Sequence, residues 1–98
     1  MNPRQEALQD LEVHFAAIAK SFDRRFDTHE FILRLAKWHQ HAYIRALATY
    51  EEVKHPFMSL HGEIGRRLST RDDFQKVGER DSPDIFGEKN SAVVWERR

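Results

Sequence analysis

The chain has 98 residues, which fits one domain, and its 16 basic and 16 acidic side chains give a formal net charge of zero. The absence of cysteine excludes disulfides, thiolate zinc sites and cysteine catalysis. A composition of 40% hydrophobic and 33% charged residues is typical of a globular domain, and the charge balance gives the whole chain no attraction to nucleic acid or anionic membranes.

The N-terminal stretch MNPRQEALQDLE lacks the apolar centre of a signal peptide. No apolar run approaches the ~20 residues that a membrane-spanning helix needs. We therefore expect a cytoplasmic protein that makes no use of a membrane.

An amphipathic helix is predicted over residues 3–22. Asn2 can cap its start, and Pro3 suits the first helical position. Its apolar side chains recur at helical spacing and fall on one stripe of the helix. The stripe consists of Leu8, Leu11, Phe15, Ile18, Ala19 and Phe22.

A second, long helix is predicted over residues 27–52. Asp27 and Glu30 have the spacing of a capping box, in which each side chain bonds a free backbone amide of the first turn. Apolar residues cover more than half of the helix circumference. A helix so widely apolar is usually central and is packed by neighbours on several sides, or it buries one flank against a second copy of the chain.

The polar side of this long helix carries a basic ridge. Its members follow one another at spacings of three, four and four, so that they would form one line on the surface. They are Arg34, Lys37, His41 and Arg45. The apolar side carries Trp38, Tyr43 and Tyr50, which are residue types that anchor protein interfaces.

A third helix is predicted over residues 56–69, since the residue before Pro56 disfavours helical dihedrals and Pro56 itself can begin a helix. Gly62 and Gly65 are unusual inside it, because each costs about 1 kcal/mol relative to alanine. Close approach of another backbone is the favoured explanation, and close approach of a ligand is the alternative.

The tail, residues 70–98, is rich in charges, glycine and turn residues. We favour a loop with a short helical turn that docks Phe86 and Trp95 onto the helices, and a small β-hairpin is the alternative. The predicted fold is therefore a single, mainly α domain over residues 1–98. It is a helical bundle of three principal helices with a long central second helix and a compact tail.

Metal and catalytic chemistry find no support in the residue pattern. His39 and His41 are two positions apart and would point about 200° from each other on a helix, so they cannot share an ion. The serines lack the context of an activated nucleophile, and the glycines form no phosphate loop. We expect no enzyme activity, no metal, no cofactor and no small-molecule substrate.

A nucleic-acid reading depends on the basic residues. Residues 61–69, HGEIGRRLS, loosely resemble the first helix of a helix-turn-helix, and residues 70–80 would then be the recognition helix. Asp72 and Asp73 at its start disfavour that assignment. If the tail forms a hairpin, a winged-helix arrangement is conceivable by analogy.

The leading hypothesis is a small non-enzymatic interaction or assembly module that binds a protein partner or a second copy of itself. It depends on the wide apolar arc of the second helix. The alternative is a small nucleic-acid-binding or regulatory protein that uses the basic ridge.

Overall fold

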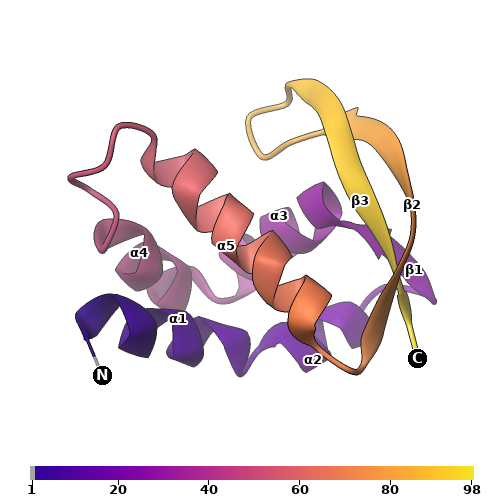
Figure 1. The fold of residues 1–98 in the computed structure, drawn as a ribbon, viewed down its shortest axis with the longest axis horizontal. Coiled ribbons are helices and arrows are strands. Elements are labelled where there is room, and N and C mark those ends of the chain that lie inside the picture. The colour runs from indigo at the N-terminus through magenta and orange to yellow at the C-terminus, as the bar shows by residue number, and fades with distance from the viewer. Residues whose placement is uncertain (1) are drawn as a thin grey trace.

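The computed structural model describes residues 2–98 and shows an α+β fold, with helices packed against one side of an antiparallel sheet (Figure 1). The prediction of a mainly α helical bundle is therefore wrong. The elements in chain order are α1 (Pro3–Glu12), α2 (Phe15–Lys20), β1 (Arg25–Asp27), α3 (Thr28–Trp38), α4 (Gln40–Ala48), α5 (Pro56–Thr70), β2 (Phe74–Pro83) and β3 (Lys89–Arg97).

The sheet has three strands in the order β1-β3-β2, and both neighbours run antiparallel to β3. Strands β2 and β3 form a long hairpin, whose turn contains Gly87 at a φ of 82°. The loop with a short helical turn that was favoured for the tail is therefore wrong, and the alternative, a β-hairpin, is correct. Strand β2 was not favoured from the sequence, because only Phe74 in it is buried. It therefore shows no alternation of apolar and polar residues, which is the usual signal of a strand.

A β-bulge interrupts the pairing of β2 with β3. Lys76 lies opposite Trp95, whereas Gly78 lies opposite Val94, so Val77 is an extra residue on β2. Beyond the bulge the register continues without interruption to Pro83, opposite Lys89.

The helix expected over residues 3–22 is divided into α1 and α2 by a turn at Val13 and His14. The His14 N–H donates to the Leu11 carbonyl, three residues back, which tightens the chain at this point. Val13 is 70% exposed, so the turn places an apolar residue in solvent between two stretches that face the core.

The long central helix expected over residues 27–52 does not form. Its first residue belongs to β1, and His39, at φ −130° and ψ 57°, separates α3 from α4, which ends at Ala48. The His39 ring stacks on His14 with centroids 3.7 Å apart, so the two helix interruptions meet. Helix α4 packs against α1, and α3 leads from the sheet, so the apolar arc is divided between two helices (Figure 1).

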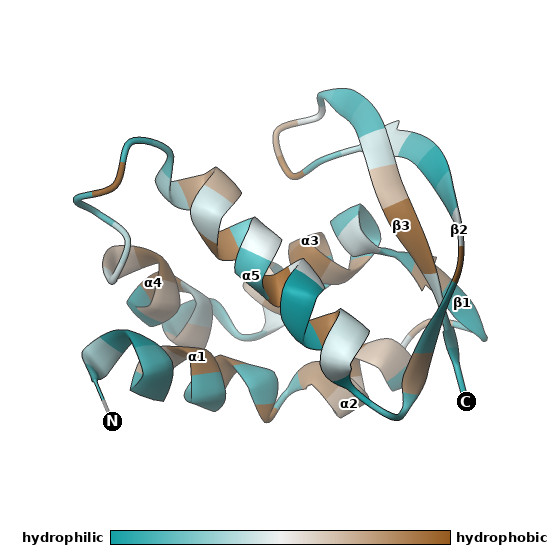
Figure 2. Ribbon diagram, in the orientation of Figure 1, coloured by the Kyte–Doolittle hydropathy of each residue, from teal (hydrophilic) through white to brown (hydrophobic). Residues whose placement is uncertain are grey.

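Helix α5 crosses the molecule between the other helices and the hairpin (Figure 1). Leu60, Ile64 and Leu68 have no exposed surface. Hydrophobic segments recur along α5 between hydrophilic ones, as Figure 2 shows. From the sheet, Phe26 and Trp95 complete the core, and the Trp95 indole N–H donates to the Thr28 hydroxyl at 2.9 Å.

Asp27 joins β1 to α3 and is fully buried. The expected capping box is confirmed: Asp27 accepts from the Glu30 N–H at 2.8 Å, and Glu30 accepts from the Asp27 N–H at 2.9 Å. Arg80 of β2 donates to the second Asp27 oxygen at 2.9 Å. Burial raises the pKa of Asp27, but the bonds from Glu30, Arg80 and Ser82 outweigh it and hold the pKa below its ordinary value.

Replacing Asp27 with alanine is expected to lower the free energy of unfolding by about 2 kcal/mol or more, because a helix cap and a hydrogen bond to a charged group disappear together. Urea denaturation at neutral pH would measure the loss. Asp23→Ala removes an exposed carboxylate nearby and is the control, with an expected change within about 0.5 kcal/mol. Equal losses in the two variants would contradict the role given to Asp27.

Candidate functional site

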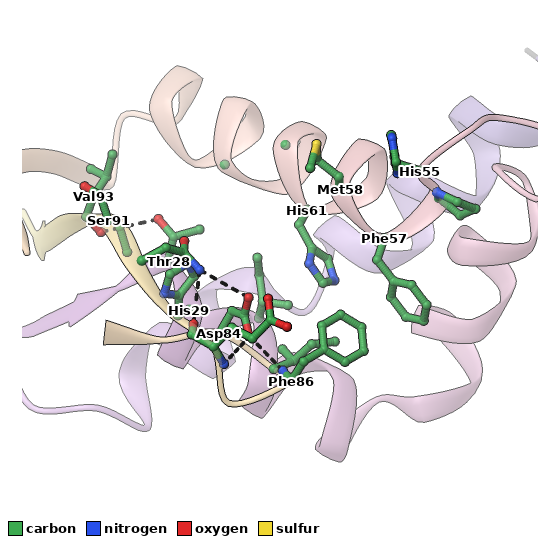
Figure 3. Close-up of a pocket in the computed structure, with 18 of the residues that line it drawn as sticks. Thr28, His29, His55, Phe57, Met58, His61, Asp84, Phe86, Ser91 and Val93 are labelled. Atoms are coloured by element: carbon green, nitrogen blue, oxygen red, sulfur yellow. Dashed lines mark hydrogen bonds between the residues drawn. The ribbon is translucent and has the colours of Figure 1, made fainter. Parts of the chain in front are cut away.

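A groove with a volume of about 760 Å³ opens between α5 and the β2–β3 hairpin, above the start of α3 (Figure 3). Its volume lies within the range of about 300–1,000 Å³ that is usual for ligand sites. Apolar walls with a few polar groups directed inward are the usual composition of such sites. The apolar lining comes from Ile32, Pro56, Phe57, Met58, Ile85, Phe86, Ala92 and Val93.

Gly62 and Gly65 form part of the α5 wall of the groove. A Cβ built on Gly62 would meet nothing within 4 Å, and one built on Gly65 would only touch the Thr28 methyl at 4.0 Å. The explanation favoured from sequence, close packing of another backbone, is therefore wrong for both glycines. The missing side chains keep this wall of the groove open.

The outer end of the groove is aromatic. Phe57 at the start of α5 packs edge-to-face on Phe86 of the hairpin turn, with ring centroids 5.0 Å apart. Phe86 is nevertheless 60% exposed, and neighbouring Met58 is 71% exposed. The apolar surface thus continues from the groove onto the outside of the molecule.

His61 points from α5 into the groove (Figure 3). Burial lowers its pKa to about 4, so the ring is neutral near pH 7, although Asp84 acts in the opposite direction. The Tyr43 hydroxyl lies 2.6 Å from His61 Nε2, and burial raises the pKa of Tyr43 to about 12. A protonated Tyr43 can donate to Nε2, which leaves the His61 proton on Nδ1 as a hydrogen-bond donor for an occupant.

The hairpin is fixed to the start of α3 by His29. Its Nδ1 lies 2.9 Å from the Ser82 hydroxyl and 3.1 Å from the Ser82 carbonyl oxygen. A serine beside a histidine has the spacing of a nucleophile and its base. Because the Ser82 hydroxyl is also among the groups that lower the pKa of Asp27, and Ser82 does not line the groove, the pair serves to hold the hairpin.

The three residues proposed as an interface do not share a surface. Tyr43 and Tyr50 are buried, at 6% and 7% exposed. Tyr43 bonds to His61, whereas Tyr50 lies under the Arg4 guanidinium, 4.1 Å from the ring centroid. Trp38 remains 59% exposed at the end of α3.

The basic ridge is interrupted at His39, between its second and third members. Arg45 pairs with Asp10 at 3.5 Å, and His41 is exposed. Arg34 donates to the Ser21 carbonyl oxygen and lies over the rings of Phe22, at 3.9 Å, and Trp38, at 5.5 Å. Lys37 is exposed beside them and has no acidic partner within 4.0 Å among residues 2–98.

Across the part of the chain that the structure describes, no group of three or more histidine or acidic side chains could hold a metal ion. No helix in residues 2–98 has both the length and the hydropathy to cross a lipid bilayer. Comparison of the chain with family models, with curated proteins and with solved structures found no match. The chemistry of the groove is therefore the guide to function.

The low pKa of His61 predicts acid sensitivity. The unfolded chain takes up this proton near pH 6.5 and the folded chain only near pH 4, so stability should be full above pH 6.5 and lost as the pH falls toward 4, by roughly 3 kcal/mol. His61→Gln should show a smaller loss over this interval in urea denaturation. His41→Gln, at an exposed position, should lose as much as the wild type, and the same acid dependence in all three proteins would refute the assignment.

Proposed function

We propose that this protein is a non-enzymatic interaction module of the cytoplasm, which binds an apolar segment of a protein partner in the groove between α5 and the hairpin. The observation that carries the proposal is the open glycine wall. Gly62 weakens α5 by about 1 kcal/mol relative to alanine, and no contact made by the folded chain requires a residue without a side chain there. We attribute the glycine to an occupant of the groove, which needs the space that a side chain at this position would fill.

The exposed side chains around the groove favour a protein partner over a small molecule. Phe86 and Met58 extend the apolar surface beyond the groove itself, and aromatic residues and methionine are enriched in protein interfaces. A small ligand would fill the groove and leave these side chains in water. A chain segment can fill the groove and cover them at the same time.

A substitution that fills the groove should reduce partner binding without reducing the stability of the fold. Gly62→Leu should project a side chain into open space, so the fold should keep or gain up to about 1 kcal/mol from the better helix propensity. Partner binding should fall at least tenfold. Ser69→Leu is the matched control, because Ser69 is exposed on the same helix and does not line the groove.

The probe for this test is a library of random peptides displayed on phage and selected against the wild-type protein. Affinities of enriched peptides would be measured by fluorescence anisotropy, with light scattering to determine the mass of the protein. Peptides that bind the wild type and Ser69→Leu, and not Gly62→Leu, support the proposal. No enrichment, or equal binding to all three proteins, would overturn it. A dimer that Gly62→Leu dissociates would identify a second copy as the partner.

A second candidate function is binding of single-stranded nucleic acid at the patch formed by Phe22, Arg34, Lys37 and Trp38. An exposed indole beside stacked and free cations is the composition of a base-stacking surface. The β2–β3 hairpin itself offers little to a phosphate backbone, because its turn region carries Asp81, Asp84 and Glu88.

Trp38→Ala is expected to weaken binding of a labelled single-stranded DNA by about tenfold, as the loss of one stacked base would do. Anisotropy at low and at physiological salt would measure this, and affinity should fall steeply with salt. Ile44→Ala removes another exposed apolar side chain, at 60% exposed, and should leave binding unchanged. Absence of salt-dependent binding in the wild type would eliminate this candidate.

A further inference from the structure

Strand β3 has an incomplete neighbour on one side. Along its other side it pairs with β2 from Lys89 to Arg97. On the β1 side, the pairing covers only Val94, Trp95 and Glu96, because β1 ends at Asp27 and the chain turns into α3. Within residues 2–98, no strand lies beside the segment Lys89–Val93 on this side.

Hydrogen bonds elsewhere in the sheet show which backbone groups of β3 face this open edge. The Arg97 N–H donates to the Arg24 carbonyl on the β1 side, whereas the Arg98 N–H donates to the Asp73 carbonyl on the β2 side. Successive residues of a strand direct these groups to alternate sides. Lys89, Ser91 and Val93 therefore direct their N–H and C=O groups away from β2.

Only one of these groups has a partner from the start of α3. The Thr28 hydroxyl donates to the Val93 carbonyl at 3.3 Å, which agrees with the alternation. Ser91 and Lys89 are exposed, and no backbone hydrogen bond is formed by either on this side within the described chain. Such an edge is a template for another strand.

The open edge overlaps the groove at Ser91 and Val93. Ser91 and Val93 line the groove on one side, and α5 with Gly62 and Gly65 lines it on the other (Figure 3). Lys89–Val93 spans about 13 Å at the rise of an extended strand. This length of open edge can pair with four or five residues of an added strand. The glycines allow the side chains of an added strand to lie close to the helix.

We infer that the groove binds its partner as an extended segment that pairs with β3 at Ser91 and Lys89, in the position that a longer β1 would occupy. This inference rests on the proposed function and specifies the conformation of the partner. Alternate side chains of the segment enter the apolar space lined by Ile32, Met58 and Val93. The backbone supplies the hydrogen bonds, and the walls select apolar residues at every second position.

Amide hydrogen exchange distinguishes this mode from binding of a helix. The probe is the tightest peptide obtained from the selection against the groove. Binding should slow exchange of the Ser91 amide at least tenfold, because this N–H acquires a partner. The amides of Asn90 and Ala92 face β2 and are internal controls, with little change expected. A peptide that binds without protecting the Ser91 amide would overturn the inference and leave the proposed function intact.

Backbone substitutions provide the second test. Ser91→Pro removes the N–H that faces the groove and no bond to β2, and proline is tolerated at such edge positions. It should abolish peptide binding, while Ser91→Ala, which keeps the N–H, should bind like the wild type. If Ser91→Pro fails to fold, single N-methylation along the peptide replaces it. Losses of at least tenfold at every second peptide residue support strand pairing, and a uniform small effect along the peptide would refute it.

Discussion

A single buried carboxylate connects the two parts of this fold. Asp27 ends β1 and caps α3, and it accepts hydrogen bonds from the Glu30 N–H in the first turn of that helix and from the guanidinium of Arg80. A buried charge must have such partners, because its desolvation is otherwise too costly. The start of α3, the end of β1 and the middle of β2 are thereby brought to one point. The groove exists because α3 leaves the sheet here, before β1 has covered the whole of β3.

The sequence contains strong signals for some of these features and weak ones for others. The capping box at Asp27 and Glu30 and the start of α5 at Pro56 depend on local chemistry, and both are visible in the chain alone. The break at His39 is not visible, because apolar periodicity continues across it, and the features that accompany the break, the stacking of His39 on His14 and the packing of α4 on α1, appear only in the structure. The hairpin is equally obscure, since most of β2 is exposed and its pattern carries no alternation.

The groove itself was partly marked in the sequence. Gly62 and Gly65 stood out within an apolar helix, but the sequence did not show whether they faced another backbone or open space. Phe86 belonged to a tail of uncertain conformation, so its meeting with Phe57 across the groove depends on the hairpin turn. The low pKa of His61 could not be predicted from the sequence, because it depends on burial beside Tyr43, a residue 18 positions earlier.

The β-bulge at Val77 decides which side of the sheet receives the polar residues of the hairpin. Antiparallel partners share a face, and Arg80, opposite Ala92, thus lies on the same face as Val94 and its partner Asp27. If Val77 were paired with Val94 in the ladder, Gly78 would lie opposite Val93 and every later side chain of β2 would turn to the opposite face. Arg80 could not then reach Asp27, and Ser82 could not reach His29. The bulge thus sets the face from which Arg80 and Ser82 align the hairpin with α3, and so shapes the groove.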